Sequence, residues 1–221
     1  MIRPHRFKGV YTDGKMLFTI NSVPGKKVYG ERLVSSGKKE YRGWNPWRSK
    51  LSAYISRGGK VFPFSKNSNI LYLGAASGTT TSHMADIASR GMVISVEFSP
   101  RSFRDLVDVA EERKNMVPVL ADARRPETYA PLVGEADVVY QDISQRDQVD
   151  IFVKNLELFL KDSGTGVLML KARSIDSSMA PGKIFQDAVD GIVLNGYDVD
   201  DVLTMAPFQK DHAAIFVHRR K

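Results

Sequence analysis

The sequence predicts an α/β protein with a parallel sheet covered on both faces, an antiparallel last strand and a small β-rich domain in front. Three observations predict this class. Apolar, strand-like runs alternate with helical patterns from Ser68 onward, a glycine loop follows the first of these runs, and residues 1–45 carry hairpin signals. With 221 residues, 43% of them hydrophobic, the chain can form the small basic domain over residues 1–45 and a full-sized domain over residues 46–221.

The front domain is expected to contain two hairpins. Asp13-Gly14 separates Val10-Tyr11 from the apolar residues 16–18, and Ser36-Gly37 follows the run 28–34. These dipeptides favour tight turns, so the segments on either side should pair as antiparallel strands.

A helix is expected directly after the front domain. Asn45 can cap it, Pro46 suits its first position and Gly58-Gly59 ends it. Its buried stripe should comprise Trp47, Leu51, Tyr54 and Ile55. This spacing leaves Lys50 off the stripe, free to point elsewhere.

The remaining chain alternates between the two kinds of element. Buried strands are expected over 70–73, 92–96, 117–120, 136–140 and 167–170, and helices after 78, from Ser99-Pro100, over 149–160 and over 183–194. The last two strands, near 197–203 and 213–218, are joined by too few residues for a helical crossover. They should therefore be antiparallel.

The glycine loop at residues 74–78 indicates a nucleoside ligand. A dinucleotide loop needs a glycine where this chain has Ala76, and a phosphate-binding loop needs Lys after Gly78, where this chain has Thr79. The loop alone could be an ordinary strand-to-helix turn. An adenosine without phosphate, such as S-adenosylmethionine, fits a site that includes Gly74 better than ATP or GTP does.

Two carboxylates strengthen that interpretation. Glu97 ends the second strand, at about the separation from Gly74 at which an acid reaches ribose hydroxyls. Asp122 follows the third strand, where it can accept a hydrogen bond from an adenine amino group.

Further polar residues should meet at the same sheet edge. Asp142 follows the fourth strand, Lys171 ends the fifth, and His212 precedes the antiparallel last strand, whose start lies at that edge. Methyl transfer to an oxygen requires positioning and removal of a proton. Lys171 can remove it when burial and a neighbouring cation, such as Lys50 or the sulfonium, favour its neutral form, and Asp142 can orient Lys171 and stabilise the positive donor.

Charge is distributed unevenly along the chain. Residues 1–60 carry 14 Lys and Arg against 3 Asp and Glu, whereas residues 61–221 carry 18 against 22. This asymmetry favours a polyanionic partner such as nucleic acid, although a basic solubilising face is the alternative. The absence of cysteine excludes thiol chemistry, four scattered histidines predict no metal site, and no apolar run or signal peptide predicts membrane association, so an intracellular address is expected.

Six segments resemble the fibrillarin family, in the family's order and over nearly the whole chain. They are WNPWRSKL at 44–51, LYLGAASGTT at 71–80, VEFS at 96–99, DAR at 122–124, KARSID at 171–176 and KDHA at 210–213. The resemblance implies a Rossmann-like class I methyltransferase that places 2′-O-methyl groups on rRNA and tRNA as the catalytic subunit of a box C/D ribonucleoprotein.

The resemblance also implies site residues and partners. Cofactor contacts fall on Thr79, Thr80, Glu97, Phe98, Asp122, Ala123, Asp142, Ile143, Ser144 and Gln145, and Lys50, Asp142, Lys171 and His212 surround the ribose. The family's usual Asp-Val-Ala-Gln is here Asp142-Ile143-Ser144-Gln145. Implied partners are box C/D guide RNA, target RNA, a Nop-family scaffold protein and a kink-turn-binding ribosomal-type protein. The chain resembles the short archaeal-type form, for which a cytoplasmic address is expected.

Three other functions stay open from the sequence. A stand-alone RNA ribose methyltransferase would use the same site. A nicotinamide-dependent oxidoreductase could use Glu97, but Ala76 and the pair Asp122-Ala123 argue against it. A non-catalytic scaffold for an RNA particle would not need Lys171 or Asp142, and both are present.

Overall fold

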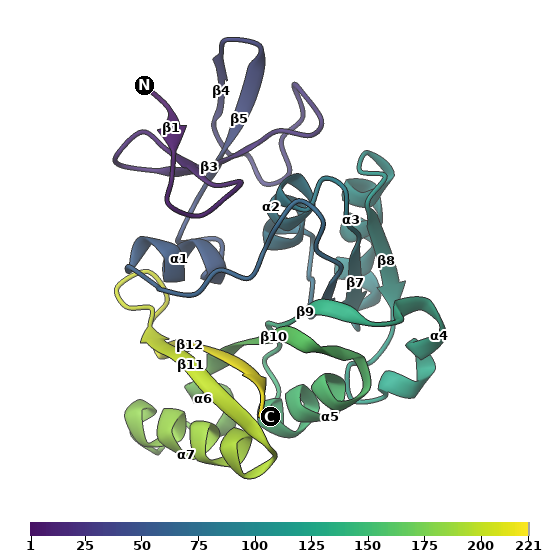
Figure 1. Ribbon diagram of the computed structural model, residues 1–221, viewed down its shortest axis with the longest axis vertical. Helices are drawn as coiled ribbons and strands as arrows, with labels where there is room; N and C mark the ends of the chain where they lie inside the picture. The colour runs from purple at the N-terminus through teal and green to yellow at the C-terminus, as the bar shows by residue number, and fades with distance from the viewer. Residues whose placement is uncertain (221) are drawn as a thin grey trace.

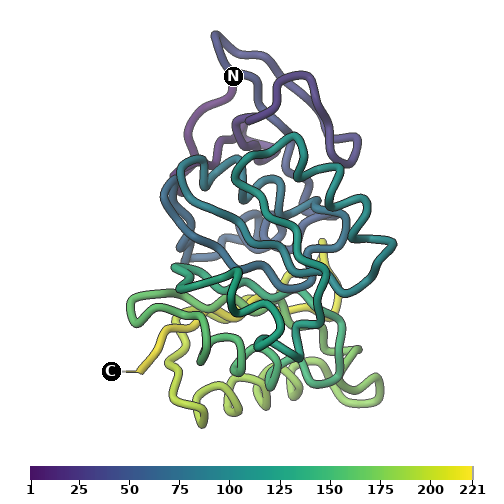
Figure 2. Tube along the Cα trace, turned by 90° about the vertical axis from the view of Figure 1, so that its right-hand side faces the viewer, coloured from purple at the N-terminus to yellow at the C-terminus, as the bar shows by residue number. Residues whose placement is uncertain are grey.

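The computed structural model describes residues 1–220 and contains two sheets. In Figure 1 the smaller, N-terminal sheet lies at the top, and the central sheet with its helices lies below it. Figure 2 shows the same division from the side. None of the described helices is long and apolar enough to cross a membrane.

The N-terminal sheet is antiparallel, with strand order β1-β2-β3-β5-β4. Its strands are β1 (Arg3–Pro4), β2 (Tyr11–Thr12), β3 (Leu17–Ile20), β4 (Leu33–Ser36) and β5 (Lys39–Trp44). Both predicted hairpins form, β2–β3 around Gly14 and β4–β5 around Gly37. Only the end of the run 28–34 is a strand, because Gly30 adopts a φ of 84° and breaks the extended path.

The central sheet has seven strands in the order β11-β12-β10-β9-β6-β7-β8. They are β6 (Ile70–Leu73), β7 (Val93–Glu97), β8 (Met116–Leu120), β9 (Ala136–Gln141), β10 (Leu160–Lys171), β11 (Tyr197–Thr204) and β12 (His212–Arg219). All are parallel except β12, which pairs antiparallel with both β10 and β11. The predicted sheet and its antiparallel end are thus confirmed. β10 begins seven residues before the expected 167, because its polar, glycine-containing first half hides the strand pattern.

Helices cover both faces of the central sheet, and the sheet separates two apolar cores. They are α1 (Lys50–Ser56), α2 (Thr79–Ile87), α3 (Pro100–Glu111), η1 (Pro126–Thr128), α4 (Ala130–Val133), α5 (Gln148–Phe159), α6 (Ala172–Ile175) and α7 (Pro181–Leu194). One core contains apolar residues of α1, α2 and α3, and the other those of α5 and α7. The sequence did not predict η1, α4 and α6, which have three or four residues each and are too short for a periodic pattern.

The start of α1 differs from the prediction. Asn45 closes a preceding turn by accepting the backbone N–H groups of Arg48 and Ser49, so Ser49 becomes the N-cap and its hydroxyl accepts from Ser52. Asn45 is therefore not the cap. Trp47 consequently lies before the helix and is 60% exposed, so its predicted place on the buried stripe is wrong.

A buried ionic cluster joins the N-terminal sheet to α2. Arg42 on β5 donates to Glu31 at 2.7 Å and to Asp86 on α2 at 2.8 Å, and no part of the Arg42 side chain is exposed. Asp86 also accepts from Thr19 at 3.0 Å. Because Trp44 and Leu17 belong to the same apolar core as α2, the N-terminal sheet packs directly onto the α/β part of the chain. The boundary between residues 45 and 46 stays a prediction.

Candidate active site

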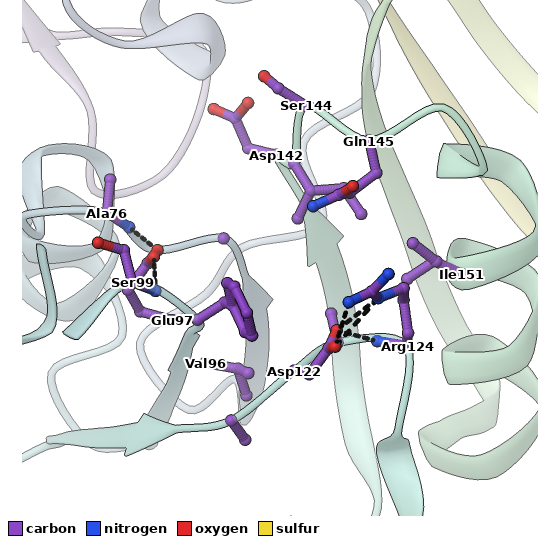
Figure 3. A pocket seen from close by; sticks show the side chains of 15 residues that line it. Ala76, Val96, Glu97, Ser99, Asp122, Arg124, Asp142, Ser144, Gln145 and Ile151 are labelled. Carbon is purple, nitrogen blue, oxygen red and sulfur yellow. Dashed lines mark hydrogen bonds and ion pairs between the residues drawn. The ribbon is translucent and has the colours of Figure 1, made fainter. Parts of the chain in front are cut away.

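A pocket of about 220 Å³ opens at the carboxyl edge of the central sheet (Figure 3). It lies where the strand order reverses around β6, the position at which open α/β sheets bind ligands. It is lined by the last residues of β7, by residues that follow β6, β7, β8 and β9, and by Ile151 of α5: Gly74, Ala76, Val96, Glu97, Phe98, Ser99, Ala121, Asp122, Ala123, Arg124, Asp142, Ile143, Ser144 and Gln145.

The loop after β6 adopts a backbone conformation that restricts which residues can occupy it. Gly74 has a φ of 81°, and a Cβ at this position would lie 2.5 Å from the backbone oxygen of Asp142. Glycine is therefore required for the loop after β6 to approach the end of β9. Ala76 also has a positive φ, 48°, which a residue with a Cβ adopts only when its surroundings enforce it.

Glu97 holds that loop in place. Its Oε2 accepts the backbone N–H of Ala76 at 2.8 Å, and its Oε1 accepts that of Ser99 at 2.7 Å (Figure 3). The sequence predicted only a ligand contact for Glu97, and the structure adds this second role. Each carboxylate oxygen keeps a further lone pair with which it can accept from a ribose hydroxyl.

Asp122 lies on the pocket wall in a close pair with Arg124. The guanidinium donates to Oδ1 at 3.1 Å and to Oδ2 at 3.0 and 2.7 Å. This hydrogen bonding lowers the pKa of Asp122. Sequence reasoning missed Arg124 as a pocket residue. The signal was present, because an arginine two residues after an acid in a turn can reach back to that acid. The predicted contact of Asp122 with an adenine amino group must share the carboxylate with Arg124.

The pocket's chemistry fits S-adenosylmethionine. Three carboxylates, on Glu97, Asp122 and Asp142, outnumber the one arginine, which is already paired. Such a lining attracts a sulfonium cation and disfavours a phosphate. The predicted contacts Phe98, Ala123, Ile143, Ser144 and Gln145 all line the pocket.

Thr79 and Thr80 are placed differently from the other predicted cofactor contacts. They open α2, outside the residues that line the pocket, and the Thr80 hydroxyl donates to Ser49 at 3.0 Å. Their role as cofactor contacts stays a prediction.

The four predicted catalytic residues come together at the rim of this pocket. Lys50, at the start of α1, donates to Asp142 Oδ1 at 2.5 Å, and both side chains are mostly buried, with 19% and 14% exposed. On the neighbouring strands, Lys171 at the end of β10 is the register partner of His212 at the start of β12. Asp142 therefore belongs both to the pocket and to the cluster of cations beside it.

Two buried glutamines fix the strand ends that carry this cluster. Gln148 accepts the backbone N–H of Lys171 at 3.0 Å and donates to its carbonyl at 3.1 Å. Gln141, which directly precedes Asp142, donates to the carbonyl of Gln148 at 2.6 Å. These bonds couple the backbone at Asp142 to that at Lys171.

His212 is a neutral acceptor in this environment. Burial lowers its pKa, and the Lys50 and Lys171 cations lower it further, against opposing contributions from the Lys210 carbonyl and Asp142. The ring Nδ1 lies 2.6 Å from the Lys210 carbonyl, which can only accept, so Nδ1 carries the proton. The Nε2 lone pair is then free to accept a hydrogen bond.

The sheet order, the glycine loop and the acidic pocket define a Rossmann-like, S-adenosylmethionine-dependent methyltransferase. The sequence model of the Fibrillarin family matches residues 2–221, and the chain belongs to this family.

Relatives and solved structures agree with this assignment. The fibrillarin-like rRNA/tRNA 2′-O-methyltransferase of Methanothermobacter thermautotrophicus is 47% identical over 211 residues, which cover 96% of this chain and 94% of the relative. Aeropyrum pernix fibrillarin, crystallised with natively bound S-adenosyl-L-methionine, is 42% identical with a TM-score of 0.91 over 98% of this chain and 97% of that one. A fibrillarin/Nop5p complex contains a chain that is 39% identical, with a TM-score of 0.88 over 96% of this chain and 98% of that one.

Proposed function

We propose that this protein is the catalytic subunit of a box C/D ribonucleoprotein, in which a guide RNA directs transfer of a methyl group from S-adenosylmethionine to ribose 2′-hydroxyls of rRNA and tRNA. One observation carries the proposal. Asp142 lines the cofactor pocket and also holds Lys50, while the β10–β12 register brings Lys171 and His212 to the same rim. The resemblance to the short archaeal-type form is the basis for proposing a cytoplasmic location.

The site residues divide the chemistry among themselves. S-adenosylmethionine, when bound, supplies an electrophilic methyl group on a sulfonium. Glu97 and Asp122 hold the nucleoside part, and the Asp142 carboxylate stabilises positive charge beside the pocket. The neutral form of the Lys171 amine takes the proton of the 2′-hydroxyl and becomes an ammonium, Lys50 orients Asp142, and the free Nε2 of His212 accepts a hydrogen bond from the ribose. Positioning and proton removal are the two contributions that such a displacement requires.

Substitution of Asp142 tests whether the site is catalytic or only structural. Asp142→Ala should weaken cofactor binding and slow methyl transfer together, because the residue belongs to both the pocket and the cluster. Equilibrium titration with S-adenosylmethionine and with NAD, before and after the substitution, also tests the choice of cofactor. Binding of NAD in place of S-adenosylmethionine would contradict the proposal.

The distribution of charge supports dependence on partners. Of the 14 Lys and Arg in residues 1–60, all are exposed except Arg42 and Lys50. A basic surface attracts phosphates without reading sequence, so a guide RNA is needed for selectivity. Crystallisation of a related fibrillarin with Nop5p supports a Nop-family scaffold, and a kink-turn-binding protein completes the proposed particle.

Reconstitution tests this dependence. The purified chain should bind RNA weakly and methylate free target RNA poorly at near-physiological salt. Adding guide RNA, the scaffold and the kink-turn-binding protein should produce methylation of one nucleotide, set by its position in the guide duplex. Efficient, site-selective methylation of naked RNA by the chain alone would instead identify a stand-alone enzyme.

A further inference from the structure

Beside the four-residue cluster lies a pair of aromatic side chains, Trp47 and Phe208, which the chemistry above does not use. The rings contact edge to face, with centroids 5.2 Å apart and planes at 77°. Trp47 is 60% exposed, whereas Phe208 is partly buried against the apolar core. An exposed tryptophan supported from below by a second ring presents a large flat face at low cost in conformational entropy.

Trp47 and Phe208 lie on the two segments that lead into Lys50 and His212, the turn before α1 and the loop between β11 and β12. Trp47 precedes Lys50 by three residues and Phe208 precedes His212 by four. Gln209 ties the segments together by donating to the Pro46 carbonyl at 3.0 Å, and Asn45 Oδ1 accepts the Trp47 backbone N–H at 2.9 Å. In Figure 1 the loop between β11 and β12 accordingly lies against the beginning of α1. The aromatic face is thus fixed relative to the catalytic cluster.

The charge around this face favours RNA as its occupant. Lys210 is exposed on the loop that carries Phe208, and Lys50 and Lys171 lie at the adjoining rim, whereas the guanidinium of Arg48 lies over the ring of Tyr29, 5.9 Å from its centroid. Aromatic side chains interleaved with basic ones form the usual surface for single-stranded nucleic acid, because the rings stack on bases and the cations attract phosphates. An apolar docking site for a protein helix or strand would not need these neighbouring lysines.

We propose that Trp47, supported by Phe208, stacks against a nucleobase of the substrate RNA next to the ribose that is methylated. The proposal rests on the function proposed above and adds a substrate contact to it. Trp47 positions the RNA and takes no part in proton or methyl transfer.

Intrinsic fluorescence isolates this contact. The chain has two tryptophans, and the other, Trp44, is fully buried and bonded to Ser49. Titration with a short single-stranded RNA at low ionic strength should quench the Trp47 emission, while inorganic polyphosphate, which has no bases, should leave it unchanged. Trp47→Phe should abolish the signal change and identify its source. Absence of quenching by RNA, or equal quenching by polyphosphate, would overturn the proposal.

A matched pair of variants tests how Trp47 contributes to the binding of target RNA during methyl transfer. In the reconstituted particle, Trp47→Leu should raise the KM for target RNA roughly 5- to 150-fold, the usual contribution of one stacked base. Trp47→Phe should stay near the wild type, because phenylalanine keeps an aromatic face. Binding of S-adenosylmethionine and the thermal unfolding midpoint should not change in either variant.

Two further outcomes, one from the variants and one from the fluorescence titration, would overturn the proposal. One is equal retention of activity by the Leu and Phe variants. The other is a fluorescence change produced by the scaffold protein and not by RNA, which would make the face a protein contact. If the wild-type particle transferred no methyl group at all, the proposed function would fail, while the fluorescence titration would still decide the stacking contact.

Discussion

Two ionic clusters in this protein bring together similar side chains in different surroundings. Arg42 and its carboxylate partners are closed off between the N-terminal sheet and α2, with hydrogen bonds to Glu31, Asp86 and Ser82. Lys50 and Asp142 form one short contact at the rim of a pocket and remain partly exposed. Buried charges that bond to one another are costly to disrupt and are closed to a ligand, whereas partly bonded charge beside a cavity can still act on a ligand. The difference separates a structural joint from a reactive site.

We call Lys50, Asp142, Lys171 and His212 the open cluster, and Arg42 with Glu31 and Asp86 the closed cluster. The largest expected effect is on the rate of methyl transfer and comes from the open cluster. Lys171→Ala should lower single-turnover methyl transfer by roughly 10²- to 10⁴-fold, the usual contribution of a positioned acid or base, with cofactor affinity nearly intact. Lys161→Ala is the matched control, because Lys161 lies at the other end of the same strand in a pair with Asp137. A normal rate in the Lys171 variant would move the proton acceptor to Lys50, His212 or a water.

Substitutions in the closed cluster should instead change the free energy of unfolding. Arg42→Ala removes the cation between two buried carboxylates and should lower the free energy of unfolding by roughly 3–5 kcal/mol, measured by chemical denaturation. Arg220→Ala breaks an exposed pair with Asp198 and should cost less than about 1 kcal/mol. Equal losses in the two variants would show that the buried network contributes no more than a surface ion pair.

Glu97 lies between these extremes, because it bonds the backbone and faces the pocket. Glu97→Ala should weaken S-adenosylmethionine binding by roughly 1–3 kcal/mol, the range for unmatched hydrogen bonds in a shielded site. Isothermal titration calorimetry measures this loss, and Glu111→Ala, on the exposed side of α3, serves as control. Unchanged affinity with an intact thermal transition would remove Glu97 from the cofactor site.

The smallest effect expected is a pH dependence of stability near the closed cluster. Burial lowers the pKa of His83 well below 6.5, and Arg42 and Arg113 lower it further, so the ring is neutral in the folded protein. Below pH 6.5 the unfolded chain takes up the proton and the folded one does not. Stability should therefore fall as pH decreases, by up to about 1.4 kcal/mol for each pH unit.

His83→Gln tests this dependence by removing the titrating ring while keeping polar atoms near Thr19 and Tyr29. Denaturation midpoints at several pH values between 5 and 7 should show a flatter profile for this variant than for the wild type. An unchanged slope in the His83 variant would show that other groups cause the acid sensitivity.

Local sequence signals predicted most of the fold. The hairpin turns at Gly14 and Gly37, the Ser99-Pro100 helix start and the alternation of strands and helices all appear where periodicity and turn residues indicated. The position of His212 followed from topology, because a strand that runs backwards begins where its parallel neighbours end. The predicted residues of the open cluster were accordingly brought together.

Contacts between distant residues could not be read in the same way. Asn45 was predicted to cap α1, but it closes a separate turn, and this leaves Trp47 exposed against Phe208. The pairing of Arg124 with Asp122 and the tether from Glu97 to Ala76 also depend on how loops approach each other.

The sequence by itself determined the elements, their order and the kind of chemistry, because hydrophobic period and turn residues act over a few neighbouring positions. Only the tertiary structure decided which charges are closed off and which remain available. Solvent access and the number of hydrogen-bond partners are properties of the packed surroundings. Arg42 and Lys50, eight positions apart, look alike in the sequence, and packing makes one a structural joint and the other part of the reactive site.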